Sequence, residues 1–138
     1  MTRGLRPLLV LALVLVGVAG CGTPAGPAGD PVEARHQTVL NEISEMYAVY
    51  IKTHQKPPQK VADLATPANK TINPLSTQAI QSEEYVVVWG TDLAGNDNAV
   101  LAYHKSVPKD GGFVLLCNGS IKQMSAAEFG SAPKVGKK

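Results

Sequence analysis

This chain of 138 residues has few of the side chains from which most enzyme sites are built. It holds two cysteines, three histidines and one tryptophan, and aromatic residues make up only 5%. His36, His54 and His104 follow no zinc-site spacing such as HExxH, and the cysteines form no CxxC pair. We therefore expect no metal site and no cofactor, and we expect each histidine to be solvated or half-buried.

The chain also lacks a strong charge of either sign, with a formal net charge of +2. Nucleic-acid-binding domains concentrate lysine and arginine in a patch or stripe, and no basic stripe of this kind is present. The composition therefore predicts no nucleic-acid partner. The length predicts one small domain, and no internal repeat suggests an array.

The longest apolar run, Leu8–Val18, is shorter than the ~20 residues that a membrane-spanning helix needs. Arg3 and Arg6 precede it and small residues follow it, which predicts a secretory signal peptide over residues 1–20. Residues 18–21 (VAGC) resemble the lipobox of bacterial lipoproteins. The alternative is an ordinary signal peptide in which the cysteine occurs by chance.

The lipobox resemblance implies that Cys21 becomes the mature N-terminus and carries a diacylglyceryl group and further acyl chains such as palmitate. One acyl chain binds a membrane only marginally, at ~0.8 kcal/mol per buried methylene, so stable anchoring needs two or more chains. The expected location is the periplasmic or extracytoplasmic face of the cell membrane or outer membrane. Cys117 is then the one remaining thiol, and an intramolecular disulfide is excluded.

Residues 21–29 are expected to be the lipidated cysteine and a flexible tether, because the segment GTPAGPAG cannot bury a core. The folded domain is predicted over residues 30–130. Asp30, Pro31 and Glu33 suggest a helix start, with a capping side chain, a proline in the first turn and a capping-box acid.

Apolar residues then recur every three, four or seven positions, which predicts an amphipathic helix of about six turns that stops before Pro57 and Pro58. The residues of this face are Val32, Val39, Ile43, Met46, Tyr47, Tyr50 and His54. We expect Val39, Ile43, Met46 and Tyr50 to pack against the sheet. A short helical turn is expected at residues 61–65, and an ambiguous polar stretch follows over residues 66–84, with a turn at Asn73-Pro74 and a short helix at residues 75–81.

The second half of the chain has the composition of β-strands. Runs rich in β-branched and apolar residues predict four strands, at residues 85–89, 99–105, 113–117 and 120–124. Asn118-Gly119 predicts a two-residue hairpin turn, and Ser125 with Glu128 predicts a capping box that starts a short helix around Phe129. Residues 131–138 are expected to be a disordered basic tail.

The fold class predicted from these elements is α+β. One long N-terminal amphipathic helix packs on a small antiparallel β-sheet of about four strands, and a short C-terminal helix follows. Five aromatic residues are expected to line mostly the interface between the helix and the sheet: Tyr47, Tyr50, Tyr85, Trp89 and Tyr103. An exposed Trp89 would instead be a candidate anchor for an interface.

Residues 99–129 resemble the C-terminal part of the pseudopilin-like (prepilin-associated) domains of Planctomycetes. The matching positions are Ala102-Tyr103, Gly111-Gly112, residues 114–116 and 119–121, and Glu128-Phe129. Residues 47–64 also resemble that group's "Y-x-x-Y-x-x-T-x-x-x-P" helix end. The chain departs from the pattern at His104, Cys117 and Asn118, and the lipobox stands where a prepilin leader would be. The resemblance implies a fold and an envelope location, because the role of that group is largely unassigned.

Two further groups of residues suggest chemistry only weakly. Cys117 and His104 are the one conceivable thiol pair, but Cys117 ends an apolar strand and is expected to be a buried structural thiol on the face of Phe113 and Leu115. The loop around Asp92 and Asp97 lacks the EF-hand pattern, and a polar hairpin loop is expected instead.

The sequence thus favours a lipid-anchored, non-catalytic envelope protein with a structural or protein-binding role. Its expected partners are the membrane, through the lipid, and other envelope proteins. The alternative is a small-ligand-binding protein or an enzyme that uses the loops at residues 92–98 and 106–112. Clustered polar side chains around a pocket would favour the alternative.

Overall fold

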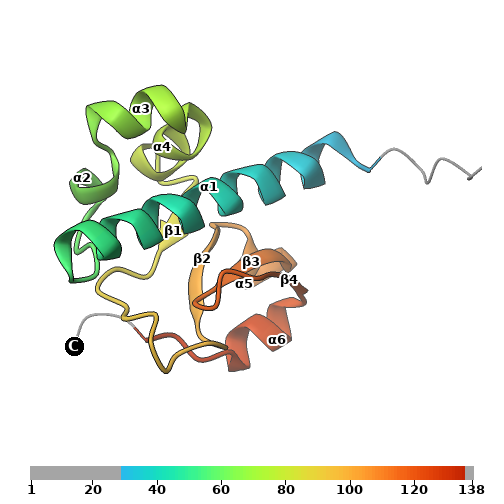
Figure 1. The fold of residues 1–138 in the computed structure, drawn as a ribbon. Helices are drawn as coiled ribbons and strands as arrows, with labels where there is room; N and C mark the ends of the chain where they lie inside the picture. The colour runs from blue at the N-terminus through green and yellow to red at the C-terminus, as the bar shows by residue number, and fades with distance from the viewer. Residues whose placement is uncertain (1–28, 136–138) are drawn as a thin grey trace, which may run out of the picture.

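One long helix crosses a four-stranded antiparallel sheet in the computed structural model, which describes residues 29–135 (Figure 1). Three short helices lie on the far side of this long helix from most of the sheet, and two more follow strands β2 and β4. The elements are α1 (Pro31–His54), α2 (Val61–Leu64), α3 (Pro67–Ile72), α4 (Pro74–Gln81), β1 (Tyr85–Val87), β2 (Val100–His104), α5 (Val107–Asp110), β3 (Gly112–Leu116), β4 (Ile121–Met124) and α6 (Ala126–Ser131). The predicted α+β class is confirmed.

Helix α1 begins at its predicted cap. The Asp30 carboxylate accepts the backbone N–H of Val32 at 2.9 Å, and Pro31 occupies the first turn. The cap consists of this hydrogen bond. The predicted capping box, in which the Glu33 side chain would also accept the Asp30 backbone N–H, is not formed. The helix ends where Gln55 adopts the left-handed conformation, with φ of 55°, two residues before the prolines that were expected to stop it.

The buried face of α1 is wider than the predicted one, because the helix packs against two neighbours. Its buried residues are Val39, Leu40, Ile43, Met46 and Tyr47. Met46 contacts α4, since its sulfur lies 4.0 Å from the Ser76 hydroxyl and 3.9 Å from the Thr77 hydroxyl. Three expected members of the face differ, since Tyr50 is half-buried, His54 is exposed and Val32 is 60% exposed.

Helices α2 and α4 lie where short helices were predicted, whereas α3 was not predicted. Thr66 caps α3 by accepting the backbone N–H of Asn69 at 3.2 Å, and Pro67 follows it in the first turn. This threonine–proline pair is a helix-start signal, although the polar residues after it carry no apolar periodicity.

The sheet is a simple meander with strand order β1-β2-β3-β4, and each neighbouring pair is antiparallel. The first strand stops at Val87 rather than at the predicted Trp89. A register shift between Val100 and Ala102 interrupts the pairing of β2 with β3. Strands β1 and β4 form the two edges.

Both faces of the sheet are covered, so the domain holds two apolar clusters. The larger cluster joins α1, α2 and α4 to one face and includes Leu115 and Cys117, with Phe113 packed against it. The smaller cluster joins α5 and α6 to the other face and includes Val114 and Leu116. The predicted alternation of side chains between the two faces of β3 (Gly112–Leu116) is confirmed. The face that carries Val114 and Leu116 is buried as well, in the smaller cluster.

The turn after β3 has a different form from the predicted two-residue hairpin. The Leu116 carbonyl accepts the N–H of Gly119 at 2.9 Å, and the Leu116 N–H donates to the Ser120 carbonyl at 2.9 Å. Three residues therefore form the loop, and Gly119 alone among them has positive φ, at 81°. This is the pattern of a tight turn followed by a glycine bulge, in which only the last residue needs the left-handed region.

The C-terminal segment packs more closely than expected. Ser125 and Glu128 form the predicted capping box at the start of α6. Beyond the helix, the Pro133 carbonyl accepts the N–H of Val100 at 2.8 Å, and the Lys134 ammonium lies 4.1 Å from the centre of the Phe129 ring. Residues 131–135 therefore contact the domain rather than forming the predicted disordered tail, and residues 136–138 lie outside the described part.

Candidate functional site

Three titratable rings from distant parts of the sequence meet at one end of the sheet. The rings of His36 on α1 and His104 on β2 lie edge to face, with centroids 5.0 Å apart. Tyr85 on β1 lies beside both, with its ring 5.2 Å from His104 and its hydroxyl hydrogen-bonded to Nδ1 of His36. This His36–Tyr85–His104 group was not predicted, because the histidines were treated as separate.

The backbone brings these rings together by two routes. Strand pairing places Tyr85 directly opposite His104, so the two rings share one face of the sheet. Helix α1 crosses that face and places His36 on the same side, three residues before the buried Val39. Sequence spacing gives no sign of this arrangement, because it depends on the register of β1 with β2 and on the position of α1 across the sheet.

His104 is held by the chain that follows it. Its Nδ1 accepts the backbone N–H of Ser106 at 3.2 Å and lies 2.8 Å from the Ser106 hydroxyl. An Nδ1 that accepts this bond carries no proton, so the proton of the neutral ring is on Nε2, 4.0 Å from the Glu84 carboxylate. Burial, followed by the neighbouring His36, lowers the pKa of His104, although Glu84 opposes this effect.

An ion pair and a protonated phenol lie beside the two imidazole rings. Burial, and secondarily the Glu84 carboxylate, raises the pKa of Tyr85 to about 12, so its hydroxyl stays protonated. Arg35 pairs with Glu84 at 3.2 Å, and the arginine side chain is 55% exposed. An ion pair this exposed contributes little stability, so its main effect is to fix the Glu84 carboxylate near His104.

A pocket of about 190 Å³ opens beside the two histidines. It is bounded by the first turns of α1, the segment after β2 and the start of β3, and its lining residues include Val32, Glu33, Ser106, Val107, Gly112 and Phe113. The apolar part can hold a small organic group, while imidazole, carboxylate and hydroxyl groups offer hydrogen bonds. Within residues 29–135, no three His, Cys, Asp or Glu side chains lie close enough to hold a metal ion.

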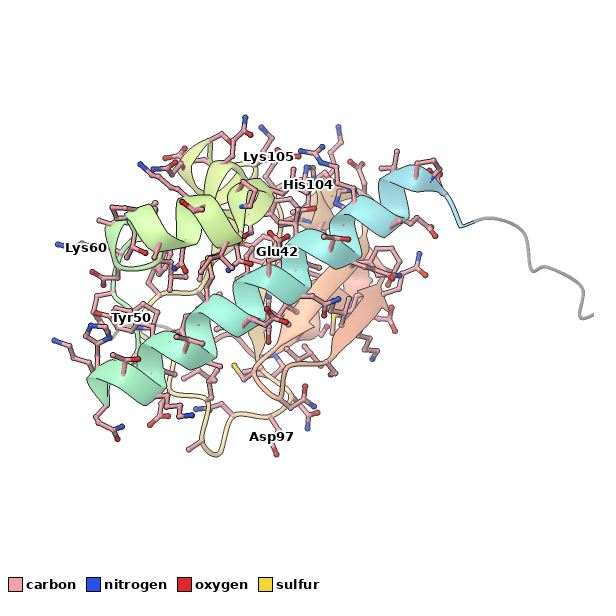
Figure 2. The ribbon with its side chains drawn as sticks, turned by 45° about the horizontal axis from the view of Figure 1, so that its top comes forward. Glu42, Tyr50, Lys60, Asp97, His104 and Lys105 are labelled. Atoms are coloured by element: carbon pink, nitrogen blue, oxygen red, sulfur yellow. The ribbon has the colours of Figure 1, made fainter. Side chains whose placement is uncertain are left out.

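The two loops that were considered together as a ligand site lie at opposite ends of β2. Residues 92–98 precede this strand and residues 106–112 follow it, and Figure 2 shows Asp97 and His104 far apart at the two ends. Only the second loop contributes to the pocket. The first loop closes on itself as a polar connection, since Asp92 accepts the N–H of Ala94 at 3.1 Å and the Asn96 amide donates to the Asp92 carbonyl at 2.8 Å.

Cys117 lies at the same end of the sheet as Asp97 and therefore away from His104. Its N–H donates to the Ala99 carbonyl, just before β2 begins, and a strand of this length rises by about 13 Å to its other end. The thiol is buried and free, and burial, followed by Asp97, raises its pKa. A protonated thiol with no histidine beside it does not form a nucleophilic pair.

The other aromatic and histidine positions are distributed as follows. Tyr47 and Tyr85 are buried in the larger cluster, and Tyr50 and Trp89 pack against it half-buried. Tyr103 differs from the expectation, because it lies on the opposite face with its ring 4.6 Å from Phe129. His54 is exposed and stacks on Tyr50.

The lipidation residue predicted from the sequence, Cys21, and the signal segment 1–20 lie outside the described residues. In the described part, no helix combines the length and the apolar content needed to cross a membrane. A scan against protein-family models found no match, and searches of curated proteins and of solved structures found none either.

Proposed function

We propose that this chain is a bacterial lipoprotein that holds a small pseudopilin-like α+β domain at the outer face of a cell-envelope membrane, where it has a non-catalytic structural or protein-binding role. The observation that carries the proposal is the order of segments at the N-terminus. A short apolar run ends in residues 18–21 (VAGC), and a tether rich in glycine and proline leads directly to the cap of α1 at Asp30.

The architecture supports a binding role over a catalytic one. The interior is filled by two apolar clusters, and the polar groups at the candidate site are engaged with one another: Tyr85 with His36, and Ser106 with His104. A long N-terminal helix followed by an antiparallel meander is also the order of elements that the resemblance implies.

Replacing each cysteine in turn tests the anchor. In the Cys21→Ser chain, the sulfur that accepts lipid is absent, so the protein should not incorporate an alkyne-labelled palmitate and should leave the detergent phase in phase partitioning. Cys117→Ser is the matched control, because it removes the other thiol and should leave labelling intact. A Cys21→Ser protein that is still labelled and still cleaved would contradict the proposal.

A second candidate function, binding of a small organic ligand, is favoured by the pocket beside His36 and His104. Val32 lines this pocket and is 60% exposed, so Val32→Trp should fill it without disturbing the core. Val49→Trp is the control on the same helix, at a residue that is 62% exposed and outside this pocket. Ligand-observed NMR with a fragment library should find binders that are lost in the first variant and kept in the second.

A further inference from the structure

The turn after β3 places an asparagine directly before a glycine on the surface of the domain. Asn118 is the one asparagine of the chain that precedes a glycine, and Asn118, Gly119 and Ser120 are all exposed. Every other asparagine precedes a residue that carries a Cβ. Glycine has no Cβ to shield its backbone nitrogen from the preceding side chain. The pair therefore has the covalent arrangement in which an asparagine amide can react with the backbone.

The Asn118 amide is held in one orientation by Ser120. Its Oδ1 accepts the Ser120 backbone N–H at 2.9 Å and the Ser120 hydroxyl at 2.6 Å. Both donors polarise the amide carbonyl, and both are aimed at the oxygen on which negative charge develops when a nucleophile adds to Cγ. Within the part of the chain that the structure describes, Nδ2 of Asn118 donates to no acceptor, so no hydrogen bond retains it as a leaving group.

One hydrogen bond opposes such a reaction. The Gly119 N–H donates to the Leu116 carbonyl at 2.9 Å, and the nitrogen must leave this bond and lose its proton before it can attack Cγ. The bond lies in an exposed turn, and exposed turns open locally at a much smaller cost than unfolding of the domain. We therefore expect solvent base to reach the Gly119 nitrogen in the folded protein.

We propose that Asn118 is a deamidation site of the folded domain, with Ser120 as the donor that stabilises the oxyanion. The Gly119 nitrogen loses its proton to solvent base and forms a bond to Cγ of Asn118, while the carbonyl electron pair moves onto Oδ1. Return of that pair expels Nδ2, which takes a proton from water and leaves as ammonia. Water then opens the succinimide at either carbonyl and gives aspartate or isoaspartate at position 118. The net reaction consumes one water and releases one ammonia.

The reaction changes the turn in which it occurs. The succinimide has no N–H at residue 119, so the bond to the Leu116 carbonyl is lost, and isoaspartate adds one carbon to the backbone of the loop. Gly119 also lies near α1, since a Cβ at this position would be 3.5 Å from the Ser44 hydroxyl. We expect modification to loosen the packing of the turn against this helix. Deamidation needs neither lipidation of Cys21 nor a partner, so it can fail or succeed independently of the role proposed above.

Peptide mapping of the full lipidated protein tests the site. The folded protein would be kept in non-ionic detergent at mildly alkaline pH, and the tryptic peptide of residues 110–122 would be followed by mass spectrometry. We expect this peptide to gain one dalton at residue 118 and to separate into an aspartate and an isoaspartate form. Asn98 is an internal control that is exposed and precedes Ala99, and it should stay unmodified. A folded protein that keeps Asn118 intact, or that loses Asn98 at the same rate, overturns the proposal.

Two variants of Ser120 test the role of its hydroxyl, and both should fold because this residue is exposed. Ser120→Ala removes one donor to Oδ1 and should slow deamidation of the folded protein about tenfold, as the loss of one hydrogen bond to a developing charge predicts. Ser120→Thr keeps a hydroxyl and should keep a rate close to that of the wild type. In concentrated urea, where the turn is not formed, all three chains should react at similar rates. A folded Ser120→Ala protein that reacts as fast as the wild type, or a difference that persists in urea, overturns the proposal.

Discussion

The rings of His36 and His104 lie edge to face, 5.0 Å apart, and so join the first turns of α1 to the end of β2. The contact favours the neutral form of the His104 ring. Protonation of His104 would place a second donor against the Ser106 N–H, and protonation of both rings would bring like charges together. The groups that face His104 from the surrounding elements are Glu84, Arg35, Lys105, Tyr85 and His36, and Glu84 alone among them favours the charged ring.

Acid should therefore destabilise the fold through His104. Its pKa in the folded protein lies below the ordinary histidine value of about 6.5, so near that pH the unfolded chain binds more protons than the folded one. The stabilisation is present above about pH 6.5 and is lost as the pH falls through the folded pKa. Urea titrations at about pH 7.5 and pH 5.5 should show a smaller loss of unfolding free energy in His104→Gln than in the wild type.

His54→Gln is the control for this titration. His54 is exposed at the end of α1 and stacks on Tyr50, away from the other two histidines. Its replacement should leave the difference between the two pH values close to that of the wild type. If His54→Gln reduces the difference as much as His104→Gln, the effect does not arise from the His36–Tyr85–His104 group.

The elements with strong local signals could be predicted from the sequence. The cap at Asp30, the apolar spacing of α1 and the capping box at Ser125 each depend on residues a few positions apart, and the structure has all of these elements. Helix α3 was missed because it buries no residue and so has no apolar periodicity. The Asn118-Gly119 pair predicted a turn at the right place, but the turn type depends on φ at one residue.

The candidate site could not be predicted, because each of its contacts is long-range. His36 and Tyr85 meet only when α1 lies across the sheet, and Tyr85 and His104 meet only through one register of β1 with β2. A shift of that register by one residue would turn one ring to the other face. The spacing of residues along the sequence does not determine the register of β1 with β2, because these strands are short and the loop between them is long.

Truncation of Ile43 tests the buried face of α1. Ile43 is fully buried in the larger cluster, so Ile43→Ala should lower the unfolding free energy by ~2–5 kcal/mol. Glu45 is exposed on the same helix, and Glu45→Ala should change stability by no more than about 0.5 kcal/mol. Denaturant titration measures both, and equal effects would mean that the helix presents a different face to the core.

Two glycines allow a matched test of the turn after β3. Gly119 has φ of 81°, where a side chain with a Cβ costs roughly 1–2 kcal/mol, so Gly119→Ala should destabilise the protein by that amount. Gly130 lies in α6 with nothing within 4 Å of an added Cβ, and Gly130→Ala should stabilise the protein by up to about 1 kcal/mol. Thermal melts compare the two, and a neutral Gly119→Ala would contradict the glycine bulge.

Cys117 should react slowly in the native protein and quickly after unfolding. Its side chain is 5% exposed in the larger cluster, and burial raises the pKa of its thiol, so both access and the thiolate fraction are low. In the Cys21→Ser chain Cys117 is the one thiol, and alkylation can be followed with and without urea. Cys117→Ala should keep the fold, because the sulfur acts there as a small apolar group. Rapid alkylation of the native protein would mean that the turn at residues 117–119 opens readily and exposes the larger cluster.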